Sequence, residues 1–104
     1  MKINEVNRII VSRTDSIGDV MLTLPFCAWL KECYPEATLV FLARGYTIPV
    51  VACFKPVDEI LDWDLIVNLP IAEKIGLLKA DCIVHLFPNK DVAALSKKAK
   101  IPYR

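Results

Sequence analysis

Seven residues near the start of the chain, Arg13–Asp19 (RTDSIGD), bring together side chains that could do chemistry. They hold two carboxylates, two hydroxyls, an arginine and the first glycine of the sequence. The segment before them, RIIVS (8–12), is rich in β-branched residues and predicts a buried strand, and residues 20–34 have a helical composition. Ligands of open parallel sheets bind at the carboxyl ends of strands, so this turn is the first candidate site.

The spacing within the turn leaves two roles open for Asp19. Ser16-Ile17-Gly18-Asp19 matches the capping-box pattern, in which a hydroxyl and a carboxylate satisfy free N–H groups at a helix start. Alternatively, a carboxylate beside a helix N-terminus stays ionised and can accept a proton from a substrate hydroxyl that attacks an electrophile. Gly18 would permit either close backbone approach or a positive φ.

A nucleotide or metal site is not expected at this turn. Both the G-x-G-x-x-G fingerprint and the phosphate-binding loop G-x-x-x-x-G-K-[ST] are absent, and no cofactor is predicted. The four cysteines show no C-x-x-C spacing, and one histidine cannot complete a zinc set by spacing. Buried, reduced thiols are expected, as in a cytosolic protein.

Strand and helix candidates alternate along the chain, which predicts βαβ units and a parallel sheet. The predicted strands are 8–13, 37–43, part of 57–64 and 81–87; the predicted helices are 17–34, 46–54 (helix or irregular), 69–80 and 91–99. Pro25 allows either one helix capped by Ser16 or a second helix start capped by Thr23. The expected fold is one Rossmann-like, three-layer α/β domain (1–104) with a mostly parallel sheet of about four strands and no strand after the last helix.

Composition narrows the function classes. The chain has 104 residues, of which 55% are hydrophobic, a high fraction for a soluble domain of this size. Buried parallel strands account for much of this excess of hydrophobic residues. Surface that normally packs against a partner would account for the rest. Lys and Arg total 13 against 12 Asp and Glu, which argues against nucleic-acid binding through bulk charge. Neither a transmembrane run of roughly 18 apolar residues nor a signal peptide is apparent.

The chain resembles the lipopolysaccharide heptosyltransferases, glycosyltransferase family 9. Members open with a strand, a polar turn ending in [I/M]-G-D-V, then L-x-T-x-P, and later Y-P before a second strand. The corresponding residues here are Ile17-Gly18-Asp19-Val20, Leu22-Thr23-Leu24-Pro25 and Tyr34-Pro35. Residues 80–104 resemble the family's D-x-x-I-x-L…Y-R segment less closely, with Pro102 in place of the usual glycine.

This resemblance implies the N-terminal, acceptor-side half of a GT-B glycosyltransferase. The donor-binding C-terminal domain, which binds ADP-heptose in the family, is absent from the sequence, so activity of these 104 residues alone is not expected. Asp19 matches the proposed general base of an inverting displacement. It would deprotonate the acceptor hydroxyl that attacks the anomeric carbon, and ADP would leave.

Residues that follow strands, together with the motif match, form the set of acceptor-binding candidates. They are Arg13, Thr14, Ser16, Gly18, Arg44, His85 and Asn89. Several also have structural interpretations, because Arg13 could pair with a neighbouring aspartate instead of an acidic acceptor. Turn chemistry explains the two hydroxyls equally well, and a lone histidine in an apolar strand is commonly structural.

The sequence therefore predicts the acceptor-binding half of an enzyme that transfers heptose from ADP-heptose to a lipopolysaccharide core. It would work in the cytoplasm, peripheral to the inner membrane, and would meet the ADP-sugar donor only through the second domain. The alternative is a non-catalytic Rossmann-like binding or interaction module, and a weaker third option is a flavodoxin-like small-ligand domain.

Overall fold

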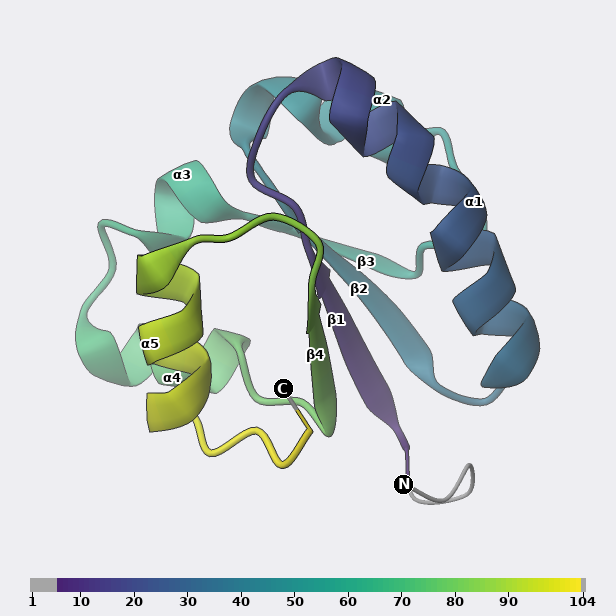
Figure 1. Cartoon of the computed structure of the whole chain (residues 1–104). Coiled ribbons are helices and arrows are strands. Elements are labelled where there is room, and N and C mark those ends of the chain that lie inside the picture. Colours follow the sequence, from purple (N-terminus) through teal and green to yellow (C-terminus); the bar gives the residue numbers. More distant parts are fainter. Residues whose placement is uncertain (1–5, 104) are drawn as a thin grey trace.

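The computed structural model describes residues 6–103 and shows a four-stranded, wholly parallel sheet (Figure 1). Met1–Glu5 and Arg104 lie outside the described residues. The former belong to the N-terminal segment searched for a signal peptide, and the latter is the arginine of the family's Y-R match. The strand order is β3-β2-β1-β4. The strands are β1 (Arg8–Ser12), β2 (Thr38–Ala43), β3 (Glu59–Asp62) and β4 (Cys82–His85). The predicted α/β fold class is confirmed.

Helical segments connect the strands, and each predicted helix is present. They are α1 (Ile17–Cys33), the 3-10 turn η2 (Gly45–Thr47), α2 (Ile48–Ala52), α3 (Trp63–Ile66), α4 (Ile71–Leu77) and α5 (Lys90–Lys98). Helix α3 was not expected as a separate element. It begins directly after β3, where the Asp62 carboxylate accepts a hydrogen bond from the Asp64 N–H. None of the helices within residues 6–103 is both long and apolar enough to cross a bilayer.

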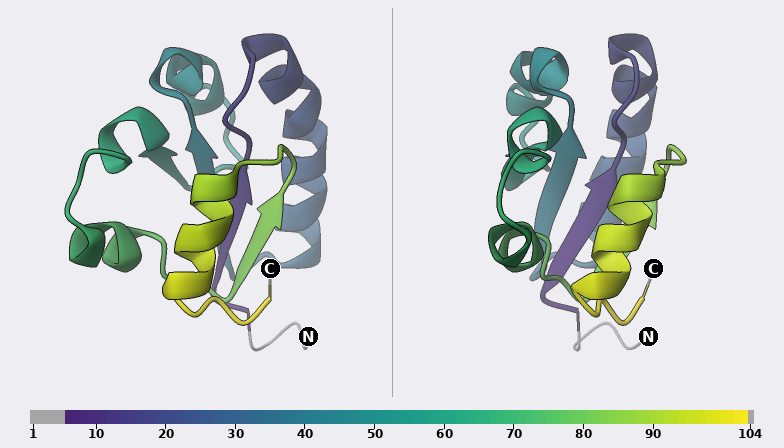
Figure 2. Two further views of the ribbon diagram at one scale, coloured as in Figure 1. Left: turned by 60° about the vertical axis from the view of Figure 1, so that its left-hand side comes forward. Right: turned by 90° about the vertical axis from the view of Figure 1, so that its left-hand side faces the viewer.

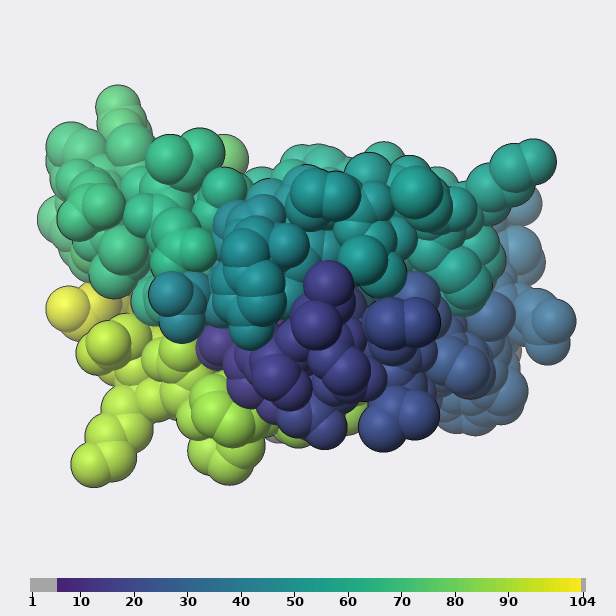
Figure 3. Space-filling model, turned by 90° about the horizontal axis from the view of Figure 1, so that it is seen from above, coloured from purple at the N-terminus to yellow at the C-terminus, as the bar shows by residue number. Residues whose placement is uncertain are grey.

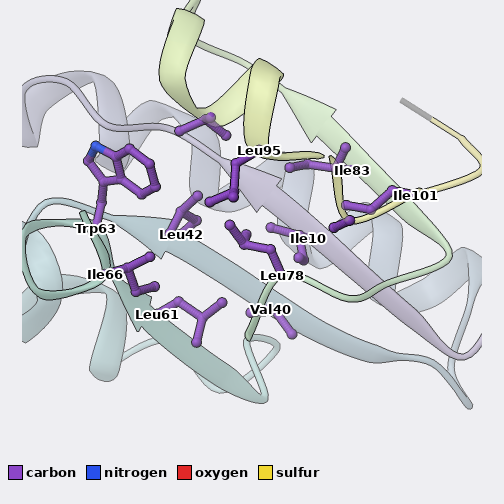
Figure 4. Close-up of a cluster of buried hydrophobic side chains, with 12 residues drawn as sticks. Ile10, Val40, Leu42, Leu61, Trp63, Ile66, Leu78, Ile83, Leu95 and Ile101 are labelled. Atoms are coloured by element: carbon purple, nitrogen blue, oxygen red, sulfur yellow. The ribbon is translucent and has the colours of Figure 1, made fainter. Parts of the chain in front are cut away.

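The domain has three layers, because the strands bury side chains on both faces. On β1, Ile9 and Val11 join the core under α1 and α2, whereas Ile10 joins the core under α3 and α5. Figure 2 shows α5 in front of β1 and β4, and α1 behind them. Figure 4 shows the cluster around Ile10 on the α5 side. This two-sided burial explains the continuous apolar runs of the predicted strands.

Helix α1 is one helix that begins after Ser16 and runs through Pro25. The alternative with a second start at Thr23 is therefore wrong. Thr23 lies inside the helix, and its hydroxyl donates to the Asp19 carbonyl four residues earlier (3.0 Å).

Carboxylates fix the amino ends of the strands. The Asp81 carboxylate accepts the backbone N–H groups of Asn7 (2.7 Å) and Arg8 (2.9 Å). The Arg8 guanidinium in turn reaches across β2 and binds Glu59 through two hydrogen bonds of 2.6 and 3.1 Å. These contacts hold the strands together at the amino end of the sheet. The turns that carry the candidate site residues lie at the opposite, carboxyl end.

The chain returns to the sheet after α5, which differs from the sequence-based expectation of no further strand. Lys100 adopts a left-handed conformation (φ 58), and the buried Ile101 then turns the chain back toward β4. Tyr103 forms a single parallel bridge with Cys82. A one-residue bridge leaves no periodic pattern, so sequence periodicity could not predict it.

Candidate functional site

The turns after β1, β2 and β4 meet at the carboxyl end of the sheet. Helix α1 connects β1 to β2 on one face, and α3 and α4 connect β3 to β4 on the other, so the connections diverge between β1 and β4. Ligands of open parallel sheets bind at such a divergence. Figure 3 looks down on this end, where the turn after β1 (purple) lies between the segment after β2 (teal) and that after β4 (light green).

Arg13 is the centre of the polar contacts in the turn after β1. Its Nε lies 3.1 Å from Asp15 Oδ1 and its Nη2 lies 3.5 Å from Asp19 Oδ1. Nη1 donates to the Leu86 carbonyl (2.9 Å), which belongs to the turn after β4. The ion-pair interpretation of Arg13 is therefore realised, and the guanidinium joins the two turns that flank the divergence.

Asp19 presents a carboxylate to solvent at the first turn of α1. Its side chain is 48% exposed, and Oδ2 accepts a hydrogen bond from the Ser16 hydroxyl (2.6 Å). That hydrogen bond is the main reason why the pKa of Asp19 lies below its ordinary value; desolvation opposes it, and the nearby Arg13 charge adds to the lowering. The carboxylate is thus ionised at neutral pH and able to accept a proton.

Two details of the turn differ from the capping-box expectation. Ser16 is the N-cap residue, but its side chain accepts no hydrogen bond from the helix N–H groups and instead binds Asp19 directly. Gly18 does not have a positive φ, and a Cβ at this position would contact nothing within 4 Å. The carboxylate and the glycine therefore face open space, which leaves room for a bound molecule.

Asn89 and Thr14 lock the turn after β4 to the turn after β1. The Asn89 Oδ1 caps α5 by accepting the N–H groups of Asp91 (3.0 Å) and Val92 (3.2 Å). Its Nδ2 donates to the hydroxyl of the buried Thr14 (3.0 Å). Both candidates are thus engaged in structural contacts that join the two turns.

His85 is the last residue of β4 and faces a hollow at the edge of the site. The hollow measures about 360 Å³ and is lined by His85, Pro88, Asn89, Lys90 and Ala93. Partial burial lowers the pKa of His85, so the imidazole is neutral at physiological pH and offers both a donor and an acceptor.

Arg44 is not brought into the same cluster. Its Nε donates to Asp64 Oδ1 (2.7 Å), and the other oxygen of Asp64 accepts the Gly45 N–H (2.8 Å). The segment after β2 instead reaches the turn through Tyr46, whose hydroxyl donates to the Asp15 carbonyl (3.0 Å). Sequence reasoning missed Tyr46; its only signal was an aromatic residue just after a strand end.

The site as described holds no metal-binding group. Among residues 6–103, no cluster of three or more His, Cys, Asp or Glu side chains is placed to bind a metal ion. What the arrangement can do chemically is accept a proton at Asp19 and bind a polar molecule beside it.

The sequence and the structure were compared with those of known proteins. No protein-family model and no curated protein matches the sequence significantly. Among solved structures, a family 9 glycosyl transferase from Veillonella parvula is 26% identical with a TM-score of 0.76, and the match covers 92% of this chain and 30% of that one. The resemblance is to glycosyltransferase family 9.

Two E. coli enzymes share the fold at lower identity. ADP-heptose lipopolysaccharide heptosyltransferase II is 20% identical with a TM-score of 0.70, over 94% of this chain and 29% of that one. Heptosyltransferase WaaC, solved with ADP-2-deoxy-2-fluoro heptose, is 16% identical with a TM-score of 0.66, over 88% and 33%. The chain therefore spans about a third of each of these proteins. The predicted resemblance to family 9 is confirmed, over that part of their length.

Proposed function

We propose that this domain is the acceptor-binding, N-terminal half of an inverting GT-B glycosyltransferase, with Asp19 as the general base. The observation that carries the proposal is an exposed, ionised carboxylate at the divergence point of a family 9 fold, oriented by Ser16 and Arg13. The motif match of Ile17–Val20 to the family's turn supports the same residue.

In the proposed reaction, an acceptor hydroxyl approaches Asp19 from the open side near Gly18. The hydroxyl oxygen attacks the anomeric carbon of the sugar, the bond from that carbon to the diphosphate oxygen breaks, and ADP takes the electron pair. The hydroxyl proton passes to the Asp19 carboxylate. Because the pKa of Asp19 is lowered, proton transfer is favourable only once the attacking oxygen has become strongly acidic, so it occurs late in the displacement.

In this proposal the acceptor and the donor are bound by different domains. A sugar-phosphate acceptor such as a lipopolysaccharide core would occupy the hollow beside His85 and Lys90, where neutral imidazole and ammonium groups can bind hydroxyls and phosphate. The ADP-sugar would be held by the second domain. The proposed location is the cytoplasmic face of the inner membrane, where such a lipid-linked acceptor is accessible.

ADP release tests the proposal in the longer polypeptide that carries this domain and a donor domain. Asp19→Asn keeps the shape of the side chain but cannot accept a proton, so we expect kcat to fall by about 10²–10⁴. Asp91→Asn is the matched control, because Asp91 is an exposed acidic residue in the first turn of α5. Unchanged turnover in Asp19→Asn would exclude Asp19 as the general base.

The isolated 104 residues provide a second test. Without a donor domain we expect no transfer of sugar from ADP-heptose, and ADP should not accumulate above the uncatalysed rate. Measurable turnover by this chain alone would contradict the proposed division of roles.

A further inference from the structure

A groove lies between α5 and the segment that carries α3 and α4, away from the candidate site at Asp19. It measures about 310 Å³, and the buried Trp63 and Leu95 form its floor. Val67 and Ile71, which are 40% and 49% exposed, form one wall. Largely apolar hollows of this size are typical of sites for small molecules, so the groove is a second candidate binding site.

The indole N–H of Trp63 is an unused hydrogen-bond donor in this groove. Trp63 is only 7% exposed, yet its indole N–H forms no hydrogen bond with any group of residues 6–103. The nitrogen keeps contact with solvent, and Figure 4 shows it on the side of the ring turned away from Leu42 and Leu95. Buried tryptophan N–H groups usually have an acceptor, so a hydroxyl oxygen of a bound molecule would complete this one.

Two ammonium groups line the opposite end of the groove. Lys98 lies in the last turn of α5 and Lys74 in the last turn of α4, and neither pairs with a carboxylate of residues 6–103. Figures 1 and 2 show α3 level with the start of α5 and α4 level with its end. Asp91, in the first turn of α5, would repel an anion from the end near Trp63. The charges therefore favour an anionic group at the lysine end.

We propose that this groove binds an elongated amphipathic anion that carries a hydroxyl at its far end. The anionic head would lie between Lys74 and Lys98, and the hydroxyl would accept the Trp63 N–H. The aliphatic body would cover Val67 and Ile71. The groove follows two turns of α5, about 10 Å along the helix axis, which is close to the length of an extended eight-carbon chain.

The groove is separate from the hollow proposed for the sugar acceptor. Helix α5 presents Lys90 and Ala93 to the hollow beside His85, whereas it presents Ala94 and Lys98 to the groove. A molecule in the groove therefore contacts a different side of the helix. The inference does not depend on the proposed transfer reaction, and its test measures binding alone.

Titration with 8-hydroxyoctanoate tests the proposal, with the indole N–H resonances of the two tryptophans followed by NMR. The Trp63 resonance should move and saturate with a dissociation constant of about 1 mM or lower. Trp29 is exposed on α1 and is the internal control, so its resonance should not move. The absence of a saturable change at Trp63 would overturn the proposal.

Two related compounds separate the contributions to binding. Octanoate lacks the hydroxyl and should bind about fivefold less tightly, as expected for the loss of one hydrogen bond. 1,8-Octanediol lacks the anionic head and should also bind about fivefold less tightly, without the salt dependence of the acids. Equal affinities for all three compounds would contradict the proposed polar contacts.

Paired substitutions on α5 locate the bound molecule. Lys98→Gln should weaken binding about fivefold, whereas Lys97→Gln, in the same turn but outside the groove, should not change it. Ala94→Phe fills the groove and should abolish binding, whereas Ala93→Phe, beside the hollow of His85, should leave it intact. Urea unfolding confirms that each variant is folded. The reverse response to the two phenylalanines, or equal binding by all four variants, would overturn the proposal.

Discussion

At the scale of single residues, the side chains of the turn after β1 are held in place by contacts with one another and with the turn after β4. Ser16 donates to the same carboxylate that Arg13 approaches, and Arg13 also binds Asp15 and the Leu86 carbonyl. The sequence predicted the carboxylate and the arginine, because both follow a strand. It could not predict which of them would pair, since Leu86 is 73 residues from Arg13 in the chain.

The effect of Ser16 on Asp19 gives a residue-scale prediction. Ser16→Ala removes the hydrogen bond that contributes most to lowering the pKa of Asp19, so that pKa should rise toward its ordinary value of 3.8. A carboxyl-carbon NMR titration measures it. Thr38→Ala, at the partly buried first residue of β2 and therefore at the opposite end of the sheet, is the control and should leave the Asp19 titration unchanged. An unchanged titration in Ser16→Ala would show that the Ser16 hydroxyl has no such effect.

Lys100 gives a second prediction at the same scale. It is the only non-glycine residue with positive φ among residues 6–103, and it ends α5 where a glycine is usual. Lys100→Gly relieves the left-handed strain and should raise the free energy of unfolding by about 0.5–1 kcal/mol, net of the greater freedom of glycine in the unfolded chain. Urea denaturation measures the change.

The matched control for Lys100 lies three residues earlier, in the last turn of α5. Lys97→Gly places glycine at an exposed position with ordinary helical geometry, so it should lower the free energy of unfolding by about 1 kcal/mol. Destabilisation by both substitutions would contradict strain at Lys100.

At the scale of elements, the strands were predictable and the short helical segments less so. Runs such as residues 39–43 are apolar throughout because both faces of a parallel strand are buried. Helix α3 has only four residues, too few to show a 3.6-residue period, and it begins because Asp62 caps it. The single bridge at Tyr103 likewise follows from tertiary packing and not from a local pattern.

The Arg8–Glu59 pair gives an element-scale prediction, since it joins β1 to β3 across β2. The Arg8 hydrogen bonds and charge lower the pKa of Glu59 from 4.5 in the folded state. The contribution is therefore complete above about pH 4.5 and is lost as the pH falls through the folded-state pKa. Because both side chains are partly exposed, it should be under about 1 kcal/mol.

Comparing variants at two pH values measures this contribution. In urea unfolding, Glu59→Gln should be less stable than wild type at neutral pH, and the difference should shrink as the pH is lowered below about 4.5. Glu36→Gln, an exposed glutamate in the turn between α1 and β2, serves as the control. A difference that persists unchanged at low pH would exclude the ion pair as its origin.

At the scale of the whole molecule, the surface is more apolar than a solvated domain requires. Met21, Leu22 and Trp29 on α1 are 56%, 80% and 56% exposed. The hydrophobic fraction predicted both buried strands and uncovered surface, and both are present. Composition alone could not say where that surface would lie, because the apolar residues of α1 do not gather on one face of the helix.

Thiol reactivity reports the integrity of the whole fold. Burial raises the pKa of Cys27 to about 11, whereas Cys53 is exposed on the surface. A thiol reagent at neutral pH should therefore modify Cys53 first and leave Cys27 unmodified until the chain unfolds globally. Mass spectrometry after limited labelling identifies the sites; early labelling of Cys27 would contradict a well-packed core beneath α1.

The hydrogen bonds between the turns have a consequence for the thermodynamics of recognition. Asn89 holds Thr14, Arg13 holds the Leu86 carbonyl, and Tyr46 holds the Asp15 carbonyl. The conformational entropy of these turns is thus already lost when the domain folds. A ligand arriving at Asp19 would meet a preorganised surface, so its association should carry a small entropic penalty and proceed without a slow loop-ordering step.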